Sequence, residues 1–170
     1  MLFRIGFIAR FVSSLALFGA IASPAMLTSN AEAGSASPFT SLAGRWVGEG
    51  RFGIKDNPPE SVKCRATYIA GASADELKQT IRCATAGGSI EVISAIQHAA
   101  GVLTGSWSET THNIAGSLEG QVTPTGFRIV VKGSDLAANM DVLVKSDSQL
   151  VEIQFFNSAL IGLTLVLHKG

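Results

Sequence analysis

Residues 127–155 read FRIVVKGSDLAANMDVLVKSDSQLVEIQF and contain three segments in which apolar and polar side chains alternate. In the first segment Phe127 and Ile129 flank Arg128, and the two later segments repeat this two-residue period. Such alternation places apolar side chains on one face of a β-strand and polar side chains on the other. Gly, Ser, Asp and Asn separate the segments, as is typical of tight turns. The stretch therefore predicts three antiparallel strands, each with one face toward a core.

The same alternation extends from Leu42 to the end of the chain, with turn residues at intervals of about eight to twelve residues. Strands are expected near 42–52, 60–70, 75–86, 89–98, 101–110, 113–122, 126–133, 138–146, 149–157 and 161–169. The pattern predicts an all-β fold, an antiparallel up-and-down β-barrel of eight to ten strands, because closing the sheet removes its exposed edges. A two-sheet sandwich is the alternative, since alternation alone does not separate the two.

The first 33 residues are typical of a cleaved secretory signal peptide. Arg4 and Arg10 supply a positive start, and Phe11–Ala22 is an apolar run too short to span a bilayer comfortably. Ala31-Glu32-Ala33 matches the small-x-small pattern of a cleavage site, so we expect cleavage after Ala33. An uncleaved N-terminal anchor is the alternative. Residues 34–41 are then expected to be a flexible segment and residues 42–170 a single barrel domain.

Charge and composition exclude some partners. The chain has 13 basic and 13 acidic residues, and removal of the leader leaves 11 and 12. Nucleic-acid binding needs a basic surface that displaces counterions, so we expect no nucleic-acid partner. A chain with 46% hydrophobic and 15% charged residues is expected to fold around a core. We expect a periplasmic or secreted protein with no stable membrane insertion after leader cleavage.

Two cysteines, Cys64 and Cys83, lie in the part of the chain that would be exported. Their segments flank the turn-rich residues 71–75, and a hairpin register that pairs the cysteines also pairs Ala66 with Ile81. Thiols in an oxidising compartment are expected to pair. A disulfide here would contribute roughly 3 kcal/mol, mainly by restricting the unfolded chain. A metal or redox pair is the alternative, but the spacing lacks a further ligand.

The segment Gly44-Arg45-Trp46-Val47-Gly48-Glu49-Gly50 resembles the opening strand of calycin barrels, which include lipocalins, fatty-acid-binding proteins and nitrobindin-like proteins. The resemblance implies a barrel whose first-strand Trp46 fills one end and whose interior holds a small ligand. In the nitrobindin-like group it implies a haem-binding His on a late strand, and His168 is the weak candidate here. The other interpretation of His168 is a solvent-facing residue near the chain end, and we expect no cofactor.

A second Gly-x-Trp occurs at Trp107, within a strand that alternates two different faces. Thr104, Ser106 and Ser108 share one face, and Trp107 shares the other with Glu109. If the hydroxyl face points inward, it offers polar groups to a cavity; we favour the register with Trp107 inside. Glu109 and His112 could bring a carboxylate and an imidazole together, but we expect a solvated loop there because Asn113 is typical of turns.

The leading hypothesis is an exported, lipocalin-like barrel that binds a small, mostly apolar ligand. The expected cavity residues are Trp46, Trp107, Phe127, Ile129, Met140, Val142 and Ile153. The alternative is an envelope structural or protein-interaction module, inhibitor-like, with a solid core. Ile54–Glu60 is expected to be a loop at the barrel mouth, either a lid or a stiff connection. The sequence contains no nucleophile elbow, phosphate loop or dinucleotide motif, so we expect no enzyme.

Overall fold

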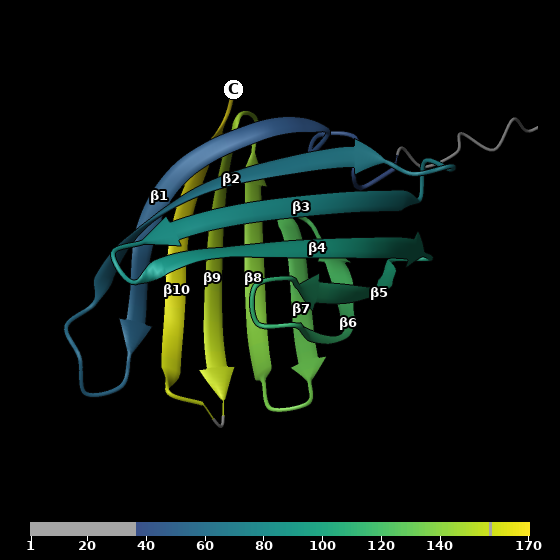
Figure 1. The fold of residues 1–170 in the computed structure, drawn as a ribbon. Helices are drawn as coiled ribbons and strands as arrows, with labels where there is room; N and C mark the ends of the chain where they lie inside the picture. The colour runs from purple at the N-terminus through teal and green to yellow at the C-terminus, as the bar shows by residue number, and fades with distance from the viewer. Residues whose placement is uncertain (1–36, 157) are drawn as a thin grey trace, which may run out of the picture. The chain divides into compact units, whose positions relative to one another are not determined.

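A computed structural model describes residues 37–156 and 158–170; the leader predicted at residues 1–33 lies outside them. Within the described residues the chain forms ten β-strands and no helix, and so no helix that could cross a membrane (Figure 1). The strands are β1 (Gly44–Ile54), β2 (Glu60–Ala70), β3 (Glu76–Thr85), β4 (Gly88–Ala99), β5 (Val102–Glu109), β6 (Ile114–Thr123), β7 (Gly126–Gly133), β8 (Ala137–Lys145), β9 (Ser148–Phe156) and β10 (Leu160–Lys169).

Each strand pairs antiparallel with its neighbours in sequence, and β1 pairs with β10 to close the barrel. The closing register joins Trp46 to Lys169 and Phe52 to Leu163. In Figure 1, β2 to β4 run nearly crosswise to β7 to β10, as opposite walls of a barrel with tilted strands do. The predicted all-β, up-and-down barrel is confirmed with ten strands, and the two-sheet sandwich is excluded.

Glycines allow the first strand to bend closely against the last one. A Cβ atom at Gly48 would lie 1.8 Å from the carbonyl oxygen of Val166, and one at Gly50 would lie 1.9 Å from that of Thr164. No side chain can be accommodated at these distances, so glycine is required where β1 curves over the barrel (Figure 1). Gly48 and Gly50 therefore allow β1 to approach β10 closely.

The described part of the N-terminal segment packs into the barrel. Residues 37–42 form turns, and Phe39 and Leu42 are each only 4% exposed within the main hydrophobic cluster. The sequence predicted residues 34–41 to be flexible, and for Phe39 this is wrong. An aromatic side chain that finds an apolar surface is held there by the area it removes from water.

The cysteine pair has the predicted register. Cys64 lies opposite Cys83 between β2 and β3, Ala66 lies opposite Ile81, and the two sulfur atoms form a disulfide with an S–S distance of 2.06 Å. Both cysteines are buried and face the barrel interior. The bond therefore fastens the inner side of the β2–β3 hairpin.

Candidate functional site

One end of the barrel is sealed by the segment that precedes β1. The fully buried Trp46 donates a hydrogen bond from its indole N–H to the carbonyl oxygen of Leu42, at 2.7 Å. Lys169 places its Nζ 5.5 Å from the centroid of the indole ring and donates a hydrogen bond to the carbonyl oxygen of Ser41. Phe39 completes the seal. We call this the closed end, where β1 begins and β10 ends; the opposite end, where β1 ends and β2 begins, is the open end.

A polar pair lies among the apolar side chains of the closed end. The Tyr68 hydroxyl donates a hydrogen bond across the barrel to Oε1 of Gln149, at 3.0 Å. Burial raises the pKa of Tyr68 far above its usual range, and the hydrogen bond to Gln149 only partly opposes this effect. The Trp46 ring meets the Tyr68 ring edge-on, with 6.4 Å between centroids. These contacts join β1, β2 and β9 into one packed layer.

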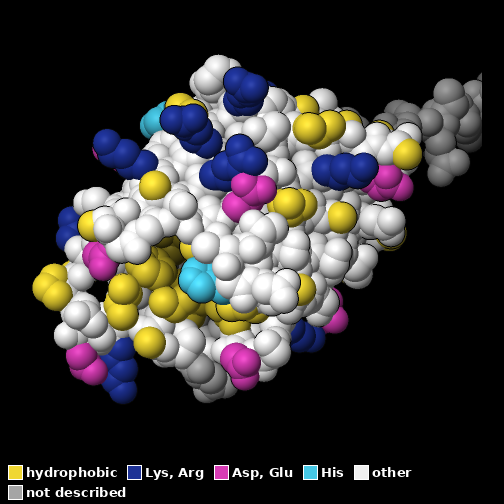
Figure 2. Space-filling view, viewed as in Figure 1, with side chains coloured by type: hydrophobic (Ala, Val, Ile, Leu, Met, Phe, Trp, Pro, Cys, Tyr) yellow, Lys and Arg dark blue, Asp and Glu magenta, His cyan; other side chains and the backbone are white. Residues whose placement is uncertain are grey.

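Apolar side chains of the open end face inward but remain partly accessible to solvent. Met140 shows the pattern: it pairs with Ile129 on β7 and Ile153 on β9, which face the same side of the wall. The inward-facing, partly exposed apolar residues of the open end include Phe52, Ile81, Val92, Val131, Met140, Ile153 and Leu163. The inward-facing residues of the closed end are buried instead, and they include Leu77, Leu103, Phe127 and Leu167, with exposures of 0–6%. Figure 2 shows a hollow with hydrophobic side chains gathered on its floor.

Trp107, Glu109 and His112 form the polar edge of this opening. Trp107 and Glu109 face inward from the end of β5, with exposures of 9% and 7%. The Trp107 indole N–H donates a hydrogen bond to the carbonyl oxygen of Lys132, at 3.1 Å. Glu109 Oε2 lies 2.8 Å from His112 Nδ1, and the His112 side chain is 64% exposed. Trp107 is therefore inside, as expected, and the carboxylate and imidazole are in direct contact.

The Glu109 carboxylate is held by several donors. Backbone N–H groups of Thr111 and His112 donate to it at 2.7 Å each, and that of Glu91 does so at 3.4 Å. Burial alone raises the pKa of Glu109, but these bonds and the His112 ring stabilise the anion and lower the pKa to about 2. The prediction of a solvated loop is wrong for Glu109. The signal was present, because Glu109 continues the inward face of Leu103 and Trp107.

The structure separates the seven predicted cavity residues into two groups. All seven face the interior, but Trp46, Phe127, Ile129 and Val142 are packed in the core with exposures of at most 9%. Met140 and Ile153 are partly exposed at the open end, and Trp107 stands beside them at its edge. Sequence reasoning missed other residues of the open end, notably Phe52 and Leu163. Their inward register was readable from alternation, but their accessibility was not.

His168 lies on the outer wall of the barrel. Its ring is exposed, it alternates with the fully buried Leu167, and its Nδ1 lies 3.1 Å from the hydroxyl of Ser148. His168 therefore cannot coordinate a haem or any other group held inside. Over residues 37–156 and 158–170, no group of three or more His, Cys, Asp or Glu side chains is placed to hold a metal ion.

The hydroxyl face of β5 also points away from the interior. Thr104 and Ser106 are exposed, and Ser108 is only partly buried, whereas their neighbours Leu103 and Trp107 are buried. The possibility that this row supplies polar groups to the cavity is therefore wrong. The register is fixed by the bulkier side chains, which lose exposed apolar area by facing inward.

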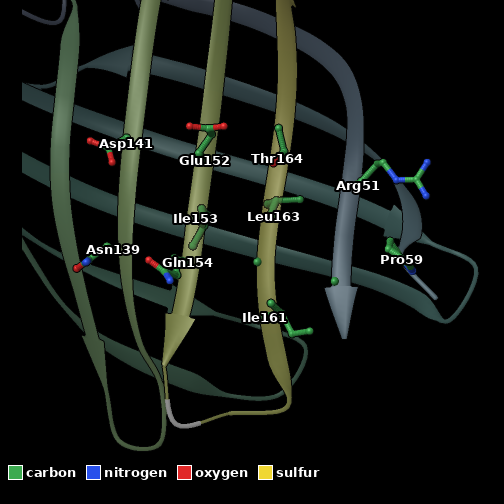
Figure 3. A pocket seen from close by; sticks show the side chains of 12 residues that line it. Arg51, Pro59, Asn139, Asp141, Glu152, Ile153, Gln154, Ile161, Leu163 and Thr164 are labelled. Atoms are coloured by element: carbon green, nitrogen blue, oxygen red, sulfur yellow. The ribbon is translucent and has the colours of Figure 1, made fainter. Parts of the chain in front are cut away.

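A groove of about 470 Å³ follows the outer wall over β8, β9, β10 and β1 (Figure 3). Asp141, Glu152 and Thr164 occupy neighbouring strands at one level of it, and Arg51 and Pro59 form its far side. These five side chains are exposed on the outer wall, and Ile153 and Leu163 of the open end also line the groove.

The loop between β1 and β2 stands at the open end. The backbone N–H of Lys55 donates to the carbonyl oxygen of Ala159 in the β9–β10 connection, at 2.8 Å, and Asp56 has a φ of 60°. The loop thus lies at the mouth, as expected for Ile54–Glu60. The choice between a lid and a stiff connection stays a prediction.

Two solved structures are similar to this chain in fold. The crystal structure of Rv2717c from M. tuberculosis has a TM-score of 0.66 and 17% sequence identity, covering 78% of this chain and 94% of that one. The S-type phycobiliprotein lyase CPES from Guillardia theta has a TM-score of 0.58 and 8% identity, covering 78% and 90%. No protein-family model and no curated protein matches the sequence.

At these identities the similarity establishes the fold alone. The aligned regions include 94% and 90% of the neighbours' own chains, so the similarity extends over the whole barrel and not over a single hairpin. The closed ten-stranded antiparallel architecture and these neighbours confirm the calycin-like fold that the Gly44–Gly50 segment indicated.

Proposed function

We propose that this protein binds a small, mostly apolar molecule in the open end of its barrel. The observation that carries the proposal is the accessible apolar surface of inward-facing side chains such as Met140, Ile153 and Leu163. Exposed apolar surface costs about 25 cal/mol per Å² relative to burial, and a ligand that covers it recovers this free energy. Small-molecule sites are characteristically concave and apolar with few polar groups, which describes this opening. The lyase among the structural neighbours is compatible with a barrel that holds a small molecule.

The proposed compartment is periplasmic or secreted. The Cys64–Cys83 disulfide supports it, because structural disulfides persist in oxidising environments. The signal-peptide pattern of residues 1–33 is the second support. We assign no catalytic role, and the proposed activity is binding alone.

Native mass spectrometry of the full chain, exported and purified from the periplasm, tests the proposal. A reproducible extra mass that is lost on denaturation supports a carried ligand. A bare protein mass, combined with no binding of the neutral fluorophore N-phenyl-1-naphthylamine, contradicts the proposal and favours the protein-interaction alternative.

Fluorescence of the two tryptophans can report at which end of the barrel the ligand binds. Trp46→Phe leaves Trp107 as the reporter of the open end, and Trp107→Phe leaves Trp46 as the matched reporter of the closed end. Binding at the open end is expected to change the fluorescence of Trp107 and leave that of Trp46 nearly constant. The reverse response would place the ligand elsewhere.

A further inference from the structure

The Glu109–His112 pair fixes the proton arrangement of an imidazole at the open end. A carboxylate whose pKa is about 2 carries no proton near neutral pH, so it can only accept hydrogen bonds. His112 Nδ1, 2.8 Å from Glu109 Oε2, must therefore carry the proton and donate it. In the neutral ring this leaves His112 Nε2 as an acceptor, and it has no hydrogen-bond partner among residues 37–156 and 158–170.

The position of this imidazole is fixed through Glu109, whose carboxylate is held by backbone N–H groups. Glu109 is anchored by the N–H groups of Thr111 and of His112 itself, both at 2.7 Å, and these bonds hold the turn after β5. Asn113, with a φ of 56°, completes the turn before β6. An acceptor held in this way needs little ordering when a ligand binds, which favours affinity. Histidine atoms stand at the edge of the apolar hollow in Figure 2.

The charges of the open end are unfavourable for an anion. On the described strands, the Lys and Arg side chains of this end point to the outer wall. Three of them form ion pairs there: Arg82 with Glu91, Arg128 with Asp141 and Lys132 with Glu119. On the strands of the open end, the inward-facing charged residues are Glu60 and Glu109, both acidic. While the His112 ring is neutral, a carboxylate drawn into this opening would lose hydration without gaining a cation.

We propose that His112 Nε2 accepts a hydrogen bond from the hydroxyl group of the bound molecule, so that the site selects uncharged apolar alcohols or phenols over carboxylates. This inference rests on the proposed function and names the ligand class for the same opening. The apolar wall around Met140 and Ile153 takes the hydrocarbon part, and the Glu109–His112 pair takes the polar end.

Displacement of N-phenyl-1-naphthylamine from the full exported chain tests the inference near neutral pH. We compare 1-decanol with decanoate, which have the same chain length and differ in the charge of the polar end. 1-Decanol is expected to compete roughly tenfold or more better, because decanoate must be desolvated beside Glu109. Equal competition, or better competition by decanoate, would overturn the inference.

His112→Phe removes the acceptor and keeps a ring of similar size. It is expected to weaken 1-decanol binding roughly three- to tenfold, the effect of one neutral hydrogen bond, and to leave binding of the fluorophore nearly unchanged. His168→Phe, on the outer wall, is the matched control and should change neither. An unchanged 1-decanol affinity in His112→Phe contradicts the inference while the proposed function stands. Failure of the wild-type protein to bind the fluorophore contradicts the proposed function itself.

Discussion

The two ends of this barrel have the same strand pattern but different interiors. At the closed end the inward-facing Leu103 and Leu167 are at most 1% exposed, and Trp46 is fully buried. At the open end, Met140 and Ile153 face the same interior and remain partly accessible. Alternation therefore determines which face of a strand points inward, whereas the depth of burial depends on what covers each end.

The covering at the closed end comes from outside the sheet. Residues 37–42 add Phe39 and Leu42 to the interior, and their turn is tied to Trp46 and Lys169 by hydrogen bonds. At the open end, residues 55–59, 86–87, 110–113, 134–135 and 158–159 of the connections are exposed, and among the described connecting residues of this end only Leu136 is partly buried. The described loops thus add no comparable apolar cover there, and this asymmetry is the reason for proposing a binding site at the open end.

The largest effect is expected from truncating Trp46, and Trp107 at the other end provides the comparison. Trp46→Ala should reduce the free energy of unfolding by roughly 4 kcal/mol, because it leaves a cavity in a packed layer and removes the bond to Leu42. Trp107→Ala should cost about 2 kcal/mol, because water can enter the space at the rim. Urea unfolding followed by far-ultraviolet circular dichroism measures both. Equal losses would show that the two ends are packed alike.

Removing the disulfide is expected to have the next largest effect. Cys64→Ala combined with Cys83→Ala should reduce the free energy of unfolding by about 3 kcal/mol, mainly because the unfolded chain becomes freer. Both cysteines are buried in the main hydrophobic cluster. Urea unfolding of wild type with and without reductant provides the control, since reductant should lower only the wild-type value. A double variant as stable as the oxidised wild type would contradict this prediction.

Particular residues show how far the sequence could be read. The strands, the Cys64–Cys83 register and the inward position of Trp107 were predictable, because each follows from a two-residue period and local turns. The burial of Phe39 was not, since it depends on a surface formed by distant strands. Met140 and Val142 carry the same signal on one strand, yet Met140 is partly exposed and Val142 is 9% exposed. Alternation indicates a face and contains no information on depth along the barrel.

Glu109 is expected to make the free energy of unfolding depend on pH. Its pKa of about 2 lies below the value near 4.3 expected in the unfolded chain. The resulting stability is present above the unfolded value and is lost as the pH falls toward 2. Between pH 5 and pH 2 the wild type should lose roughly 1–2 kcal/mol more than Glu109→Gln, a value reduced because the carboxylate lies at the rim.

Urea titrations at several pH values measure this difference. Glu119→Gln is the matched control, because the Glu119 side chain is 61% exposed in a surface pair with Lys132 and should change the profile little. Parallel profiles for wild type and Glu109→Gln would show that the hydrogen bonds to Glu109 do not stabilise its anion.

The smallest stability effect is expected at Met140, a residue of the proposed binding site. Met140→Ala should cost only about 1 kcal/mol, because its side chain is already partly exposed and water can occupy the space. Val142→Ala removes fewer atoms but should cost about 2 kcal/mol, since Val142 is packed in the core. Affinity for N-phenyl-1-naphthylamine should change in the opposite order, with the larger loss in Met140→Ala. If Val142→Ala weakened both stability and binding more, the ligand would lie deeper than the open end, among the residues that the structure shows packed together.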